Sequence, residues 1–417
     1  MADLRRRTLE VLRHTGFVRF LSARLLATLA AQIQTVAVGW QIYAITNDPL
    51  DLGLIGLSQF LPFVILILPA GQIADRYDRR RIVTLCYAAE TLCAISLLLF
   101  TLEGAANAWP VFAAMTLLGC ARAFSMPSGQ ALLPNLVPIE DFSRAVALNS
   151  STFQIATVIG PAVGGLLYLA GPAVVYSTVT TLAAIAVILM LRVNAGGRSA
   201  SASTLEPASL QTLLYGLRFV WSKPVVLGAI SLDLFAVLFG GATALLPMFA
   251  RDVLHVGPSG LGLLRTAPGI GAGLCAVWLA FHPIAHNVGK WMFAGVAVFG
   301  IATITFGLST SFLVSMLALI VLGAADMVSV YVRHLLVQLE TPDAIRGRVS
   351  AVSAVFIGAS NELGEFESGL TAKWWGGIRA VLVGGIATLV VTGVWIRMFP
   401  VLWKMQRFPS PATRAPA

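Results

Sequence analysis

The charged residues of this 417-residue chain are distributed very unevenly along the sequence. Positions 50–70 carry one charge, Asp51, and positions 82–102 carry only Glu90. Charged residues make up 11% of the chain and hydrophobic residues 57%, whereas a soluble domain carries roughly 25% charged residues. Because an apolar stretch of about 20 residues spans a bilayer as a helix, the pattern predicts a polytopic membrane protein.

The chain length admits about twelve such helices joined by short turns. We expect them at about 17–45, 50–73, 82–101, 108–126, 145–169, 173–192, 224–250, 258–281, 291–309, 312–335, 349–370 and 380–399. The predicted fold is therefore an all-α membrane protein with twelve transmembrane helices in two six-helix halves. Its predicted regions are an N-terminal six-helix bundle (1–192), a linker (193–222), a C-terminal six-helix bundle (223–400) and a tail (401–417).

The positions of the basic residues predict the orientation of the chain in the membrane. Most Lys and Arg residues flank alternate turns, and basic residues of short loops are retained on the cytoplasmic side. Both termini, the linker and the tail are therefore expected in the cytoplasm. The net charge of +9 follows from this topology, so no nucleic-acid partner is expected.

The linker contains one segment with helical periodicity. Apolar residues recur at Leu210, Leu213, Leu214, Leu217 and Trp221, which lie on one face of a helix. This spacing predicts an amphipathic helix that lies on the inner membrane surface.

The two halves show a repeat when the sequence is shifted by 204 residues. The matched pairs are Pro138 with Pro342, Arg144 with Arg348, Ala147 with Ala351, Gly160 with Gly364, and Gly165 with Gly369. Parallel repeats of six helices are one plan of membrane transporters, although a chance alignment of Gly and Arg would give a similar match. We include Arg144 and Arg348 among the candidate gate residues.

A short, densely charged turn follows the second apolar segment at 71–81. Its sequence resembles the signature loop of the major facilitator superfamily, G-x-x-x-D-R-x-G-R-[KR], at Gly71, Asp75, Arg76, Arg79 and Arg80. Asp78 stands where the family usually has glycine. The resemblance implies a loop between helices 2 and 3 that locks the cytoplasmic gate; the alternative is an ordinary basic loop on the inner side.

The fifth apolar segment contains Gly160, Pro161, Gly164 and Gly165, where glycine permits close helix contact and proline permits a bend. It resembles the helix-5 motif of drug/proton antiporters, which marks exporters; the alternative is a generic glycine-packed helix. The helix 10–11 region also resembles the bacterial branch of that group that includes the enterobactin exporter. This rests on Gln338, Thr341-Pro342, Arg346-Gly347-Arg348 and Asn361-Glu362-Leu363-Gly364-Glu365.

Ionisable residues inside apolar segments are costly in lipid and are therefore functional candidates. Asp233 is a candidate for proton coupling, as are Glu362 and Glu365, which lie three residues apart on one helix face. Glu90 and Asp326 are further candidates, for which a structural or gate role is favoured. Each acid has the alternative of pairing with a gate arginine or a helix end.

Five residues are candidates to line the substrate path: Arg24, Gln32, Thr35, Arg122 and Arg265. Gln and Thr in a membrane helix also form interhelical hydrogen bonds, so a packing role stays open for both. The sequence has no Walker loop, no Gly-x-Ser-x-Gly and no HExxH pattern, so no enzyme activity is expected. No metal site and no cofactor are expected.

These features predict a secondary transporter of the bacterial plasma (inner) membrane that works as a monomer. It would export a small amphipathic molecule, drug-like or a siderophore, by alternating access, with the proton gradient as its energy source. An importer or uniporter of a sugar or metabolite is the alternative within transport. A non-transporting sensor or scaffold is a further alternative.

Overall fold

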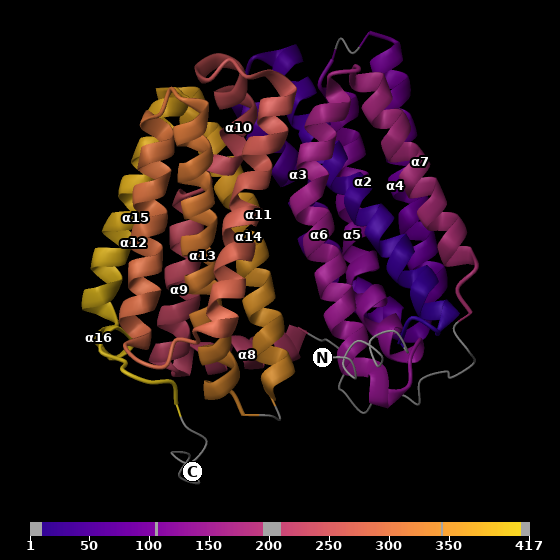
Figure 1. The fold of residues 1–417 in the computed structure, drawn as a ribbon. Coiled ribbons are helices and arrows are strands. Elements are labelled where there is room, and N and C mark those ends of the chain that lie inside the picture. The colour runs from indigo at the N-terminus through magenta and orange to yellow at the C-terminus, as the bar shows by residue number, and fades with distance from the viewer. Residues whose placement is uncertain (1–10, 105–106, 195–209, 343–344, 410–417) are drawn as a thin grey trace. The chain divides into compact units, whose positions relative to one another are not determined.

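The computed structural model describes residues 11–104, 107–194, 210–342 and 345–409, and these ranges contain helices and turns but no strand (Figure 1). The first long helices are α2 (Thr15–Thr46), α3 (Pro49–Arg76), α4 (Arg79–Leu102), α5 (Trp109–Leu132), α6 (Phe142–Tyr168) and α7 (Pro172–Leu191). After α8 (Leu210–Ser222) come α9 (Pro224–Phe239), α10 (Leu246–Met248), α11 (Gly257–Phe281), α12 (Val288–Leu308), α13 (Phe312–Glu340), α14 (Arg346–Trp375), α15 (Gly377–Met398) and α16 (Pro400–Trp403). The all-helical prediction is confirmed.

Eleven segments within the described ranges are long and apolar enough to cross a membrane. The predicted span at 349–370 corresponds to α14, which has 30 residues and is not among these eleven segments. It contains Glu362, Glu365 and Glu367, and its mean hydropathy is lower than that of the eleven. The membrane-protein class is therefore confirmed, and the count of twelve spans stays a prediction.

The span predicted at 224–250 is confirmed as one segment, Pro224–Val253, that is long and apolar enough to cross a membrane, but its helix is not continuous. Helix α9 ends at Phe239, and a 3₁₀ turn (Ala242–Leu245), α10 and a π turn (Phe249–Val253) follow. Two consecutive glycines, Gly240 and Gly241, stand at the break, and glycine is a poor helix former. The apolar composition of the segment hid this change, because hydropathy does not register a helix break.

The chain divides into two compact units of helices. The first contains α2, α3 from Ser58, and α4 to α7; α2 packs on α6 and α7, and α4 packs on α5 and α7. The second contains residues 47–57 and the helices from α8 to α16; here α13 packs on α11 and α12, and α9 packs on α14 and α15 (Figure 1).

Glycines bring the repeated helices of each unit into close contact. A Cβ atom at Gly160 of α6 would overlap the Cβ of Gln32 on α2. A Cβ atom at Gly364 of α14 would lie 2.9 Å from the carbonyl oxygen of Leu238 on α9. Gly160 and Gly364 lie 204 residues apart, and each holds the fifth long apolar helix of its unit, α6 or α14, against the first such helix, α2 or α9.

Candidate functional site

Three arginines of the first unit bind the C-terminal ends of its helices. Arg79 Nη1 donates to the carbonyl of Ala131 in the last turn of α5 at 3.1 Å. Arg80 Nη2 donates to Leu191 at the end of α7 at 2.6 Å, and Arg19 Nη1 donates to Arg192 at 2.5 Å. The last carbonyls of a helix have no intrahelical partner and carry partial negative charge, so these arginines stabilise both helix ends.

Asp78 is the N-cap residue of α4, and it stands at the position where the signature loop usually has glycine. Its backbone is extended, and its side chain accepts a hydrogen bond from the backbone N–H of Arg80 at 2.9 Å. The turn therefore needs no left-handed residue here, and aspartate acts as the helix N-cap.

The remaining gate candidates lie in different surroundings. Gly71 is half-buried and Arg76 is exposed, while Arg144 forms an ion pair with Asp141 at 3.0 Å. The side chains of Asp75 and Arg348 lie outside the part of the structure that is described. The gate function of this set stays a prediction.

The helix-5 motif residues Gly160, Pro161, Gly164 and Gly165 are all buried. A Cβ atom at Gly164 would lie 2.9 Å from the carbonyl oxygen of Ile33 on α2. The motif therefore packs directly on α2, the helix that carries the path candidates Gln32 and Thr35.

The two polar path candidates of α2 differ in their surroundings. Gln32 packs against Gly160, whereas Thr35 is exposed and its hydroxyl donates to the carbonyl of Ala31 at 2.9 Å. The neighbouring Gln34 is buried, and its Nε2 has no hydrogen-bond partner within the described ranges of the chain. The structure thus gives Gln32 a packing contact and leaves the path role of both candidates a prediction.

The first unit holds three ionisable candidates on three helices: Arg24 on α2, Glu90 on α4 and Arg122 on α5. The guanidinium of Arg122 acts electrostatically on Glu90. Nη1 of Arg24 lies 3.9 Å from the point where a Cβ atom of Gly129 on α5 would stand. Two arginines and one carboxylate give these three residues together a formal charge of +1.

The second unit holds a buried ion pair. Arg333 Nη1 of α13 lies 2.9 Å from Asp233 Oδ2 of α9, and the two side chains are 4% and 5% exposed. Removal of water from both ions is costly, so each one depends on the other for compensation. Asp233 was predicted as a proton-coupling residue, and the structure gives it an arginine partner.

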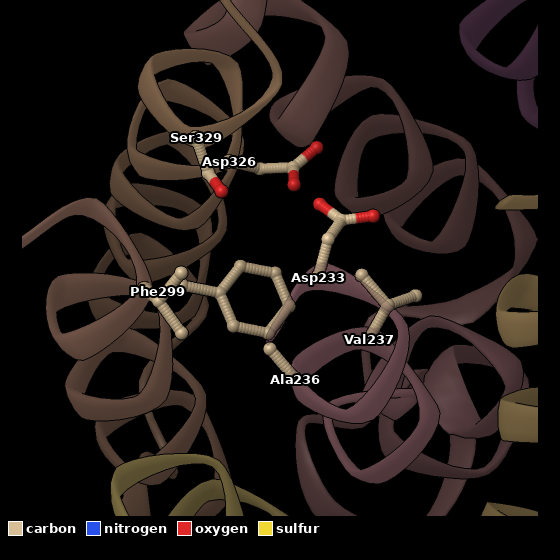
Figure 2. A pocket seen from close by; sticks show the side chains of 7 residues that line it. Asp233, Ala236, Val237, Phe299, Asp326 and Ser329 are labelled. Atoms are coloured by element: carbon tan, nitrogen blue, oxygen red, sulfur yellow. The ribbon is translucent and has the colours of Figure 1, made fainter. Parts of the chain in front are cut away.

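A second carboxylate, Asp326, lies beside this pair across a small cavity (Figure 2). The cavity has about 10 Å³ available to the centre of a water molecule, which is room for about one water. Figure 2 shows the carboxylates of Asp233 and Asp326 directed toward each other from two helices, with Ser329 beside Asp326. The hydroxyl of Ser329 is buried and has no hydrogen-bond partner among the residues that the structure describes. The cluster therefore contains two acids, one arginine and one unpartnered hydroxyl.

Glu362 and Glu365 form a second acidic group, on α14. A Cβ atom at Gly56 would lie 2.9 Å from Glu365 Oε2 and 3.2 Å from Glu362 Oε2, so both carboxylates reach the same point of α3. Arg265 of α11 acts electrostatically on Glu365, and its Nε is buried without a hydrogen-bond partner in the described part of the chain. The structure thus brings Arg265 together with an acid, which the sequence alone did not pair.

Sequence reasoning did not identify Ser329 as part of a site. Ser329 stands three residues after Asp326 and four before Arg333, so all three share one face of α13. The sequence shows this spacing on α13, but it does not show that Asp233 of α9, about a hundred residues away, joins the same site. Arg19 was likewise missed, because its carbonyl partner is a backbone group with no sequence signature.

Comparisons with known proteins agree with this architecture. The sequence model of the family described as "transmembrane secretion effector" matches residues 7–413. The enterobactin exporter EntS of Citrobacter koseri is 27% identical over 410 residues, which cover 95% of this chain and 94% of the relative. EntS of Escherichia coli O1:K1 is 27% identical over 384 residues, which cover 90% and 86%.

Solved structures give the same fold at lower identity. The nucleoside transporter NupG superposes with a TM-score of 0.69 at 15% identity, over 92% of this chain and 99% of the other. A bacterial homologue of the human lysosomal transporter Spinster gives 0.71 at 15%, over 93% and 96%. At this identity the likeness shows the fold, which is that of the major facilitator transporters.

Proposed function

Because this chain belongs to the transmembrane secretion effector family of major facilitator transporters, we propose that it exports a small, siderophore-like amphipathic molecule in exchange for protons. The chain is a multi-pass secondary transporter and not an enzyme. The direction of transport follows the named activity of its relatives, which are enterobactin exporters. The proposal includes a bacterial inner membrane, cytoplasmic termini and a single chain as the working unit.

The observation that carries proton exchange is the acidic cluster of the second unit. Asp233, Asp326 and Arg333 carry a formal charge of −1 within a helical bundle, and one added proton makes the group neutral. An uncompensated charge inside a membrane protein is costly, so a group that alternates between these two states suits a proton-driven transporter. The alternation of access would expose the cluster to one side of the membrane at a time.

The proposal is tested with the full chain reconstituted in lipid vesicles and enterobactin as the transported probe. An imposed proton gradient directed opposite to the substrate should drive enterobactin against its concentration gradient, and a protonophore should abolish this accumulation. Movement that ignores the proton gradient would favour a uniporter, and movement in the same direction as the protons would favour an importer. No flux of enterobactin, other siderophores, dyes or antibiotics would favour a sensor or scaffold and contradict the proposal.

A further inference from the structure

We propose that Asp326 is the residue that takes up the coupling proton, whereas Asp233 remains the fixed counter-ion of Arg333. This inference rests on the proposed proton exchange and assigns it to one carboxylate of the cluster. The site accepts a proton delivered by a single water molecule and does not accept a metal cation.

The two acids of the cluster differ in their partners. Asp233 is nearly inaccessible and lies 2.9 Å from Arg333, so its charge is compensated. Asp326 stands seven residues before Arg333 on the same helix and lines the cavity. Among the described residues, no basic side chain lies close enough to Asp326 to form an ion pair with it. One guanidinium therefore serves two carboxylates, and the remaining negative charge lies on Asp326.

The helices packed around this site bring little further compensation. Helix α12 contacts α13 at Gly295, where a Cβ atom would lie 2.9 Å from the carbonyl of Ala325, and the only charged residue of α12 is Lys290 at its start. Arg265 on α11 acts on Glu365 of α14. His334 on α13 acts on Asp233. Neutralisation of Asp326 by a proton is thus the available means of balancing the cluster.

The dimensions and lining of the cavity select a proton over a metal cation. Hard cations take about six or more oxygen ligands. Three oxygen-bearing side chains, Asp233, Asp326 and Ser329, meet at this cavity, and its other lining residues are Ala236, Val237, Val296 and Phe299. A water molecule in this cavity would provide the hydrogen-bond partner that the hydroxyl of Ser329 lacks among the described residues, and it would act as the proton carrier.

The proton transfer can be written as a balanced step. A hydronium ion in the cavity gives its proton to a carboxylate oxygen of Asp326, so one O–H bond breaks, another forms, and a neutral water remains beside Ser329. The formal charge of the cluster changes from −1 to zero. Arg333 keeps its bond to Asp233 in both states, so the buried ion pair acts as a permanent support.

Infrared difference spectroscopy of the purified full chain tests this assignment without any transported substrate. Spectra recorded in acidic and alkaline buffer should contain a carboxylic-acid C=O component that Asp326→Asn lacks, that Asp326→Glu retains at a shifted frequency, and that Glu90→Gln leaves unchanged. Ser329→Ala should shift the component, because the water loses one partner. A component that survives in Asp326→Asn, or one that changes when sodium replaces potassium, would overturn the proposal.

Vesicle transport gives a second readout for a correctly folded variant. Asp326→Asn should lower gradient-driven enterobactin accumulation about tenfold while downhill exchange stays within about twofold, because only the coupled step needs the proton. Equal losses of both fluxes would contradict the assignment. If the native chain moves no enterobactin, the proposed function fails at its substrate, and the infrared comparison still decides the role of Asp326.

Discussion

The two units place opposite charges at matching positions of their repeated sequence. Arg122 of α5 lies 204 residues before Asp326 of α13, and Gly129 lies 204 residues before Arg333. In the first unit Arg24 reaches toward Gly129, whereas in the second unit Arg333 itself fills that position and binds Asp233. The fourth long helix of each unit therefore carries an arginine in the first unit, Arg122, and a carboxylate of the acidic cluster in the second, Asp326.

The first long apolar helices of the two units, α2 and α9, differ in their continuity. Helix α2 is continuous over 32 residues, whereas α9 stops after 16. Val36 and Ala37 of α2 lie 204 residues before Gly240 and Gly241, where the second unit breaks. The comparison shows that the repeat keeps the packing glycines of α6 and α14 and changes the helix on which they pack.

The largest expected effect comes from opening the buried ion pair. Arg333→Met leaves Asp233 buried without a counter-ion and should lower the free energy of unfolding by about 3–5 kcal/mol. Arg122→Met, the same substitution at an arginine of the first unit, should cost about 1 kcal/mol or less because Arg122 is exposed. Denaturant unfolding of the purified variants measures both values.

A double variant sharpens this test. Asp233→Leu combined with Arg333→Met removes both ions of the pair and should recover part of the loss, because Asp233 no longer stays buried without its counter-ion, while Asp326 remains in the cluster. Equal stability of Arg333→Met and Arg122→Met would show that the two arginines contribute equally to the free energy of unfolding.

A smaller effect is expected where the repeated glycines meet the first helix of each unit. Gly160→Ala and Gly364→Ala place a Cβ atom against Gln32 and Leu238 and should each cost about 1–3 kcal/mol. Gly358→Ala is the control, because a Cβ atom there meets nothing within 4 Å and should stabilise α14 by up to about 1 kcal/mol. Thermal unfolding in detergent measures the stability of the three variants. If Gly358→Ala lost as much stability as the other two, close helix packing would not explain their losses.

The smallest effect is expected at the arginine caps of the first unit. Arg80→Ala removes the bond to the last carbonyl of α7 and should cost about 1 kcal/mol. Arg81→Ala should cost about 0.5 kcal/mol or less, because Arg81 is 85% exposed and lies 3.6 Å from Asp78. Hydrogen exchange at the end of α7 should rise in Arg80→Ala alone; a rise in both variants would indicate general loosening.

The fold could be predicted from the sequence because hydropathy and turn charges report directly on membrane helices. The predicted span at 173–192 corresponds to α7, and the amphipathic spacing of the linker corresponds to α8. The break after Phe239 could not be found this way, because its flanking residues are as apolar as those of a continuous helix. Hydropathy counts apolar side chains and carries no information on backbone geometry.

The site could be predicted only as a set of single residues. Asp233, Asp326 and Arg265 stood out because charges are rare in apolar segments. Their partners depend on which helices pack together and on how each is rotated, and a single sequence contains neither. Asp233 and Arg333 are therefore separated by a hundred residues in the chain and by 2.9 Å in the structure.

The most direct test of the account is the number of protons moved with each enterobactin molecule in vesicles that contain the native chain, Asp326→Asn or Glu90→Gln. Coupled proton movement is expected in the native chain and in Glu90→Gln, and its loss is expected in Asp326→Asn, because the proposed proton site lies in the second unit. Loss of coupling in Glu90→Gln with normal coupling in Asp326→Asn would contradict it.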